Sequence, residues 1–272
     1  MSNAHRPRKR FGQHFLRSDA VVQSIVASIA PTSEDTLLEI GPGHGVLTQP
    51  LAASGARLHA VEFDRDLVPR LRERFAGNRN VVIHEGDALR FDFASLGSPL
   101  RVVGNLPYNI STPLLFRLIE FRTFIADMHL MLQKEVVDRL AAVPATKAYG
   151  RLTIMAGSYL HTEPLFDVPA SAFSPPPRVT STVARLWPRT KEAYRIDDHA
   201  FLQRLVTQAF SQRRKTLRNA LQEFAGSDDL QALSIDPGAR AEEIAVPDWI
   251  ALANRLRQSE PSCEPLREHL RE

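Results

Sequence analysis

The chain has 272 residues, of which 43% are hydrophobic, so it can form one large domain and a small one. Its single cysteine, Cys263, excludes a disulfide framework and a cysteine-based metal centre. No run approaches the roughly 18 apolar residues that a membrane span needs. The basic start at residues 6–10 is not followed by the apolar core of a signal peptide. We therefore expect a cytoplasmic protein that binds neither membrane nor metal.

Basic residues gather in two segments, although the formal net charge is only +3. Neither residues 1–17 nor residues 200–222 contain an acid, and the basic residues of the two segments are Arg6, Arg8, Lys9, Arg10 and Arg17, then Arg204, Arg213, Arg214, Lys215 and Arg218. Two acid-free basic segments favour contacts with phosphate groups, as in a nucleic acid. The alternative is a solvated helix face.

A helical apolar period over residues 19–29 is followed by the short apolar run 37–40, which predicts a strand. The glycine-rich turn 41–45 breaks this strand at once, and helical spacing resumes at Val46. Strand, glycine turn and helix form the first half of a nucleotide-binding unit. The spacing Gly-x-Gly-x-Gly is neither the dinucleotide fingerprint nor a P-loop, which disfavours a nicotinamide dehydrogenase.

Acidic residues follow the next two predicted strands, 57–61 and 81–83. Glu62 can accept hydrogen bonds from both hydroxyls of a ribose, and Asp87 can accept one from an adenine amino group. Each acid alone is also explained as a helix N-cap. Together, after a glycine turn, they favour an adenosyl ligand.

The fourth predicted strand, 100–103, ends in Gly104-Asn-Leu-Pro-Tyr-Asn-Ile110. Ligands of open α/β sheets bind beyond the carboxyl ends of the strands, where this segment places an amide and an aromatic ring. Taken alone, the segment is explained equally well as a turn before the helix predicted at 111–120.

The remaining pattern predicts a strand at 128–132, a helix at 133–140 and a last strand at 182–187 that closes the sheet. Pro175, Pro176 and Pro177 predict an extended loop that holds Phe173. Polar residues around 188–198 indicate a linker, and only helical patterns follow. We therefore expect an α/β domain at 1–190 and a helical domain at 198–272.

With these features in place, the sequence resembles the ribosomal RNA adenine N6,N6-dimethyltransferases, most closely the bacterial members that act on 16S rRNA. The matching segments are 11–16, 38–48, 61–64, 86–88, 104–111, 173–177 and 210–218. The resemblance implies a class I S-adenosylmethionine-dependent methyltransferase fold, Rossmann-like with a seven-stranded sheet, and a small all-helical RNA-binding domain at the C-terminus.

The resemblance also implies which residues bind S-adenosylmethionine, namely His14, Leu16, Gly41, Glu62, Asp87 and Asn105. Many members of the family have Asn where this chain has His14. Both side chains can form a hydrogen bond through nitrogen, but only His changes its charge near neutral pH.

The implied reaction dimethylates N6 of two adjacent adenosines in the 3'-terminal hairpin loop of 16S rRNA within the 30S subunit, and so contributes to small-subunit biogenesis. We expect a monomer. The alternatives are an adenine-N6 methyltransferase that acts on 23S rRNA or DNA, and a protein that is primarily a 30S assembly factor.

The motif residues predict the mechanism. The side-chain oxygen of Asn105 and the backbone carbonyl of Leu106 each accept one N6 hydrogen, and Pro107 fixes the backbone. Tyr108 and Phe173 stack on the two faces of the flipped base. The RNA backbone is expected to contact Arg213, Arg214, Lys215 and Arg218.

Overall fold

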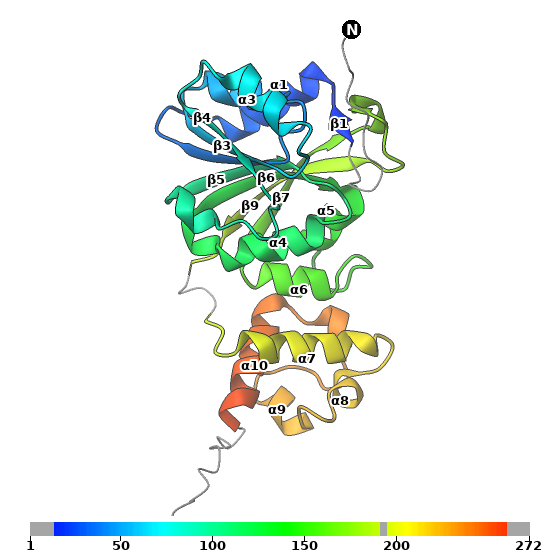
Figure 1. Cartoon of the computed structure of the whole chain (residues 1–272). Coiled ribbons are helices and arrows are strands. Elements are labelled where there is room, and N and C mark those ends of the chain that lie inside the picture. The colour runs from blue at the N-terminus through cyan, green and yellow to red at the C-terminus, as the bar shows by residue number, and fades with distance from the viewer. Residues whose placement is uncertain (1–13, 191–194, 260–272) are drawn as a thin grey trace, which may run out of the picture. The chain divides into compact units, whose positions relative to one another are not determined.

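The structure is a computed structural model that describes residues 14–190 and 195–259 (Figure 1). The start of the basic segment 1–17, the segment 11–13 of the first matching motif, and Cys263 lie outside the described residues. Within the described ranges, no helix is long and apolar enough to cross a membrane. The same ranges contain no group of three His, Cys, Asp or Glu side chains placed to bind a metal ion.

The chain divides into two compact units. The first contains residues 14–142 and 159–189, and the second contains residues 143–158 together with the C-terminal part of the chain. The sequence predicts the boundary between the domains at 190–198. Residues 143–158, expected in the first domain, group with the helical unit.

The first unit is built on a seven-stranded sheet with the strand order β4-β3-β2-β5-β6-β9-β7. The five strands from β4 to β6 are parallel, and β9 is antiparallel to both of its neighbours. The strands are β2 (Thr36–Ile40), β3 (Arg57–Glu62), β4 (Val81–Glu85), β5 (Leu100–Asn105), β6 (Ile125–Gln133), β7 (Leu160–Val168) and β9 (Ser181–Pro188). The predicted seven-stranded α/β sheet is confirmed.

The prediction that the last strand closes the sheet is wrong, because β9 lies between β6 and β7, and β7 forms the edge. The pattern missed most of β7 because the strand contains Pro164 and alternates little. Proline is tolerated on edge strands, where one side of the backbone needs no ladder partner.

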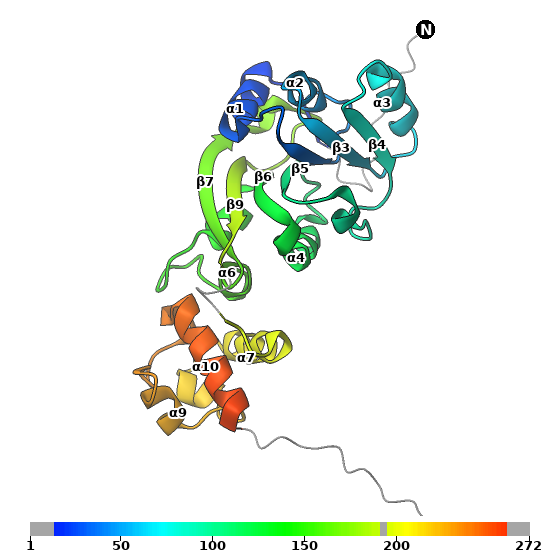
Figure 2. The same cartoon turned by 90° about the vertical axis from the view of Figure 1, so that its left-hand side faces the viewer.

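Helices cover both faces of the sheet (Figures 1 and 2). Helices α1 (Asp19–Ile29), α2 (Thr48–Ala53) and α3 (Val68–Phe75) lie on one face, and α4 (Ser111–Glu120) and α5 (Lys134–Leu140) lie on the other. The α1 side chains Val22, Ile25 and Ile29 are buried in a core cluster with Leu37 of β2 and Val103 of β5. This apolar contact follows from the helical period seen in the sequence.

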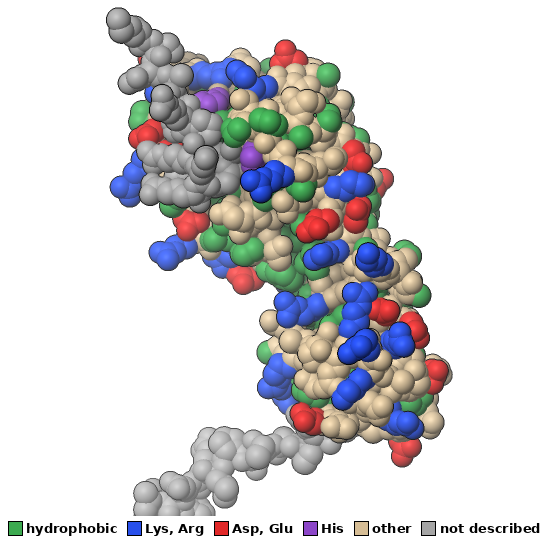
Figure 3. Space-filling model, turned by 90° about the vertical axis from the view of Figure 1, so that its right-hand side faces the viewer, with side chains coloured by type: hydrophobic (Ala, Val, Ile, Leu, Met, Phe, Trp, Pro, Cys, Tyr) green, Lys and Arg blue, Asp and Glu red, His purple; other side chains and the backbone are tan. Residues whose placement is uncertain are grey.

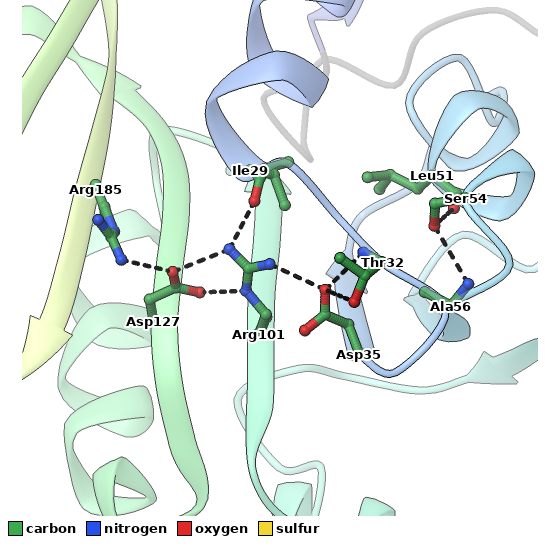
Figure 4. A network of polar contacts seen from close by, with 9 residues as sticks. All are labelled: Ile29, Thr32, Asp35, Leu51, Ser54, Ala56, Arg101, Asp127 and Arg185. Carbon is green, nitrogen blue, oxygen red and sulfur yellow. Dashed lines mark hydrogen bonds and ion pairs between the residues drawn. The ribbon is translucent and has the colours of Figure 1, made fainter.

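Arg101 lies near the start of β5 and joins this strand to β6, to the loop before β2 and to the end of α1 (Figure 4). Its guanidinium donates to both carboxylate oxygens of Asp127 at 3.0 and 3.1 Å, to Asp35 at 3.1 Å and to the carbonyl of Ile29 at 2.7 Å. Arg185 of β9 adds a contact to Asp127 at 3.2 Å. A partly buried charge is stable only with such partners.

Two short strands pair away from the main sheet. β1 (Phe15–Leu16) is antiparallel to β8 (Phe173–Ser174), with Leu16 opposite Phe173. A turn of helix, η4 (Ala170–Ala172), precedes β8, and the turns η2 (Phe93–Leu96) and η3 (Arg122–Phe124) flank β5 and β6. The pairing of β1 with β8 holds the start of the described chain against residues more than 150 positions away.

The second unit is helical, as predicted. It contains α6 (Arg151–Gly157), α7 (His199–Ser211), α8 (Leu217–Ala220), α9 (Ser227–Gln231), η5 (Ala241–Glu243) and α10 (Val246–Ser259). Residues 143–158 belong to it because Tyr149, 1% exposed, donates its hydroxyl to the carbonyl of Ile244 at 2.7 Å. The nitrogen of Ala145 also donates to the carbonyl of Glu242 at 2.8 Å.

Candidate active site

A cavity of about 270 Å³ opens at the carboxyl ends of β2, β3 and β5 in the first unit. Nine of the ten residues predicted to bind the cofactor or the base line it, namely His14, Leu16, Gly41, Glu62, Asp87, Asn105, Leu106, Pro107 and Tyr108. The tenth, Phe173, does not. Ligands of open α/β sheets bind at the carboxyl ends of the strands, which is where these nine residues lie.

The glycine turn after β2 forms one wall of the cavity. Gly41 has φ of +69°, a conformation that side chains with a Cβ rarely adopt, and its nitrogen donates to the carbonyl of Val61 at 2.9 Å. A Cβ on Gly43 would lie 3.0 Å from the ring of Phe15. The turn therefore requires glycine both for its backbone and for the close packing of β1.

Glu62 ends β3 and is 6% exposed. Its two carboxylate oxygens accept hydrogen bonds from the nitrogens of Gly43 at 3.1 Å and Asp64 at 2.8 Å. Burial raises the pKa of Glu62, and these backbone donors oppose the rise. The carboxylate is thus fixed in direction, and each oxygen keeps a second lone pair for a ligand hydroxyl.

Asp87 follows β4 on the same wall. One of its oxygens, Oδ1, accepts from the nitrogen of Leu89 at 2.9 Å. This bond orients the carboxylate while its second oxygen stays suited to a donor in the cavity.

Asn105 is held by the segment that crosses the cavity mouth. Its side-chain nitrogen donates to the carbonyl of His14 at 2.9 Å. The His14 ring donates through Nδ1 to the carbonyl of Pro175 at 2.8 Å. This bond uses one N–H of the Asn105 amide and fixes the side chain, whose oxygen can accept a hydrogen bond.

Tyr108 is half-buried and fixed at two points. Its hydroxyl forms a 2.7 Å hydrogen bond with Oγ of Ser181, and its carbonyl accepts from Oγ of Ser111 at 3.1 Å. The ring lies 5.5 Å from the His14 ring, with 29° between the two planes. His14 thus contacts both Asn105 and Tyr108, a role that the sequence pattern did not indicate.

Phe173 occupies a different place from the one predicted. It is 4% exposed and belongs to the core cluster that includes Leu16, Ile25 and Val183. Its position does not support the predicted stacking on the base. The prolines after it indicated an exposed stiff loop, but the pairing of β8 with β1 turns the ring into the core.

Glu39 lines the cavity and was missed by sequence reasoning. It is 2% exposed, and its Oε2 atom has no hydrogen-bond partner among the described residues. Burial raises the pKa of Glu39 to about 7, and the nearby Glu62 carboxylate adds to the rise. The signal in the sequence was one charge inside the apolar run Leu37-Leu-Glu-Ile40, because a buried acid in a strand is costly without a partner.

The predicted RNA-binding residues lie in the second unit, where Figure 3 shows many Lys and Arg side chains on one face. Arg214, Lys215 and Arg218 are exposed. Arg213 differs, since it forms an ion pair with Glu242 at 2.5 Å and donates to the carbonyl of Lys147 at 3.2 Å. Its guanidinium therefore has a structural contact within the unit.

A family model described as ribosomal RNA adenine dimethylase matches residues 4–258. The chain belongs to the ribosomal RNA adenine dimethylase family. It is 52% identical over 257 residues to the ribosomal RNA small subunit methyltransferase A of Aromatoleum aromaticum, covering 94% of this chain and 97% of that protein. It is 55% identical over 252 residues to the protein of the same name from Thiobacillus denitrificans, covering 93% and 98%.

Two solved structures share the fold over most of the chain. A dimethyladenosine transferase from Plasmodium falciparum is 25% identical with a TM-score of 0.80, covering 90% of this chain and 98% of that one. The 23S rRNA methyltransferase ErmE is 25% identical with a TM-score of 0.71, covering 90% and 100%. The predicted class is confirmed: this family member is an S-adenosylmethionine-dependent rRNA adenine dimethyltransferase with a Rossmann-like catalytic fold.

The residues of the cavity fit S-adenosylmethionine. The glycine turn leaves open space where a Cβ on Gly41 would lie, and Glu62 and Asp87 present acceptors for the ribose and the adenine amino group. The unpartnered Oε2 atom of Glu39 is suited to a ligand that carries positive charge. When bound, the cofactor supplies a methyl group that its sulfonium charge activates.

The position of Phe173 generates a testable prediction. We expect Phe173→Leu to keep methyltransferase activity within about threefold, because leucine preserves most of the apolar volume. We expect Phe173→Ala to destabilise the first unit by about 3–5 kcal/mol, the usual cost of truncating a buried phenylalanine. Steady-state kinetics and urea denaturation measure the two effects. A loss of activity in Phe173→Leu of more than tenfold, at unchanged stability, contradicts the packing role.

Proposed function

We propose that this protein dimethylates N6 of two adjacent adenosines in the 3'-terminal hairpin loop of 16S rRNA, with the 30S subunit as its substrate. The observation that carries the proposal is the fixed orientation of Asn105, whose amide nitrogen is bonded to His14 and whose oxygen can accept a hydrogen bond. The choice of small-subunit RNA is supported by the relatives named ribosomal RNA small subunit methyltransferase A. We further propose a cytoplasmic monomer.

The N6 amino group of adenine is a poor nucleophile because its lone pair is delocalised into the ring. The Asn105 side-chain oxygen and the Leu106 carbonyl each accept one N6 hydrogen, which directs the lone pair toward the methyl group. Leu106 is held for this role by a 3.2 Å bond from its nitrogen to the carbonyl of Met131. Alignment of this kind can contribute about 7–11 kcal/mol to catalysis.

No general base is assigned, because N6 becomes strongly acidic once it is alkylated and releases its proton to water. The base must leave its stack to reach the cavity, which costs a few kcal/mol. Stacking on Tyr108 offsets about 1–3 kcal/mol of this cost. The residues thus position the base rather than transfer protons.

Asn105 provides the most direct test. We expect Asn105→Ala to lower methyl transfer to undermethylated 30S subunits by about 100-fold or more, since the N6 acceptor is lost. Binding of S-adenosylmethionine, measured by calorimetry, should stay within a few fold of wild type. Asn80→Ala is the matched control, because Asn80 is exposed and bonded to Gly55 outside the cavity. If cofactor binding falls in parallel with activity, Asn105 mainly holds the cofactor.

The target is tested by the same assay. Labelled S-adenosylmethionine and undermethylated 30S subunits should yield N6,N6-dimethyladenosine at two adjacent positions of 16S rRNA, located by primer extension. Modification of 23S rRNA instead would contradict the proposal and indicate the activity that the name of ErmE describes.

Glu39 is the partner of the cofactor's positive charge in this proposal. With a pKa of about 7, the free carboxyl is largely protonated below neutrality, and a bound cation favours its charged form. Cofactor affinity should therefore rise with pH and fall as the pH drops below 7. Burial lowers the pKa of His129, which lines the same cavity.

We expect the affinity for S-adenosylmethionine to increase about eightfold between about pH 6 and about pH 7.5, the size set by one carboxyl that must ionise. Glu39→Gln should bind more weakly at the higher pH and lose most of this dependence. Because burial also raises the pKa of Glu62, the difference between Glu39→Gln and wild type isolates Glu39. Calorimetric titrations at several pH values measure it, and an equal pH dependence in both proteins contradicts the assignment.

The exposed basic residues of the second unit are assigned to the RNA backbone. We expect the combined change of Arg214, Lys215 and Arg218 to Ala to weaken RNA binding and to reduce the slope of affinity against salt by about 2, or about 0.7 for each of the three lost phosphate contacts on a single strand. Arg213→Ala is the comparison, since its ion pair with Glu242 makes it structural. Filter binding over a range of salt measures both, and an unchanged slope in the triple variant removes these residues from the RNA interface.

A further inference from the structure

Tyr108 is held by two serine hydroxyls, that of Ser111 at the end of the motif segment 104–111 and that of Ser181, which no motif indicated. Oγ of Ser181 bonds the phenol hydroxyl at 2.7 Å, and Oγ of Ser111 bonds the Tyr108 carbonyl at 3.1 Å. Ser181 is 0% exposed and Ser111 is 2% exposed, so water does not compete for either bond. The two bonds therefore hold the backbone of Tyr108 and the hydroxyl end of its ring, so the axis of the ring cannot tilt freely.

Ser181 is itself immobile because it begins β9, which lies inside the sheet. It pairs with Gln133 of β6 on one side and with Val168 of β7 on the other. Burial raises the pKa of the Tyr108 phenol, and the Ser181 bond opposes that rise, so the phenol stays protonated at neutral pH. The bond thus links the neutral Tyr108 hydroxyl to a serine that both neighbouring strands hold in place.

We propose that Ser181 is a positioning residue that holds the Tyr108 ring for the second methylation of each adenosine, and so determines whether the product is monomethylated or dimethylated. This inference rests on the proposed function, in which Asn105 and Leu106 accept the two N6 hydrogens.

The two methylations place different demands on the site. In the first, both N6 hydrogens are available to the two acceptors. One hydrogen is replaced by the first methyl, so monomethyladenosine can satisfy only one acceptor. The orientation of monomethyladenosine then depends more on the stacking surface of Tyr108, so the position in which Ser181 holds that ring gains importance.

The second transfer has the same chemistry as the first. The N6 lone pair forms the bond to the methyl carbon, the carbon–sulfur bond breaks, and its electron pair stays on the neutral sulfur of the departing cofactor. The remaining N6 proton passes to water. If the Tyr108 ring tilts, the rate of the second transfer falls more than that of the first, since a small misplacement of reacting atoms lowers the rate steeply.

The test compares Ser181→Ala and Tyr108→Phe, which remove the same hydrogen bond from opposite sides. Ser54→Ala is the matched control. It removes a hydroxyl that donates to the Leu51 carbonyl and accepts from the Ala56 nitrogen, in the same unit but away from the cavity (Figure 4). Each protein is incubated with S-adenosylmethionine and undermethylated 30S subunits. Digestion and mass spectrometry then give the amounts of N6-methyladenosine and N6,N6-dimethyladenosine over time.

We expect both variants to raise the ratio of monomethyl to dimethyl product by about 3- to 10-fold, the effect of one lost hydrogen bond. The double variant should show no further change, and the control should match wild type. Cofactor affinity and thermal stability should stay near those of wild type. A wild-type ratio in both variants, or an equal slowing of both methylations, overturns the inference. If wild type itself forms no N6-methylated adenosine, the proposed function fails instead.

Discussion

The hydrogen bond from the Asn105 side chain to the His14 carbonyl is the contact on which the site depends. It links the end of a central strand to a segment 91 positions earlier, and the pairing of β1 with β8 holds that segment in place. An asparagine amide can present either a donor or an acceptor to a ligand, and this bond uses one N–H and fixes the side chain. In the proposed reaction, the acceptor for N6 is thus oriented by a backbone carbonyl of the N-terminal segment.

Charged side chains are paired differently at the two ends of the parallel strands. Where the parallel strands begin, Arg101 and Arg185 compensate Asp127, and Arg101 also pairs with Asp35. Where they end, the acids Glu39 and Glu62 face a cavity and have raised pKa values. Ionised acids without cationic partners weaken a fold and attract a cation. The charges at the amino ends of the strands are paired within the protein, whereas the acids at the carboxyl ends are suited to a cationic ligand.

The predicted residues that the structure brings together around the cavity are those whose place depends on local order along the chain. Glycines, Glu62, Asp87 and Asn105 each follow an apolar run, and parallel strands bring such ends together. Phe173 and Ser181 could not be predicted in this way. Their surroundings depend on which distant strands pair, and a short stretch such as β8 carries no periodicity that shows whether its ring points inward. Glu39 was visible as a charge in an apolar strand, but its missing partner only became clear with the fold.

The antiparallel direction of β9 has a consequence for how the protein is made. A strand that runs backwards brings its first residue, Ser181, to the cavity, so the last contact with Tyr108 comes from near the end of the first unit. During synthesis, the glycine turn and the Asn105 segment emerge long before this strand. A nascent chain can fold early elements as they appear, but the cavity becomes complete only when about two thirds of the chain has left the ribosome. The order of the strands along the chain therefore makes completion of the cavity a late step in synthesis.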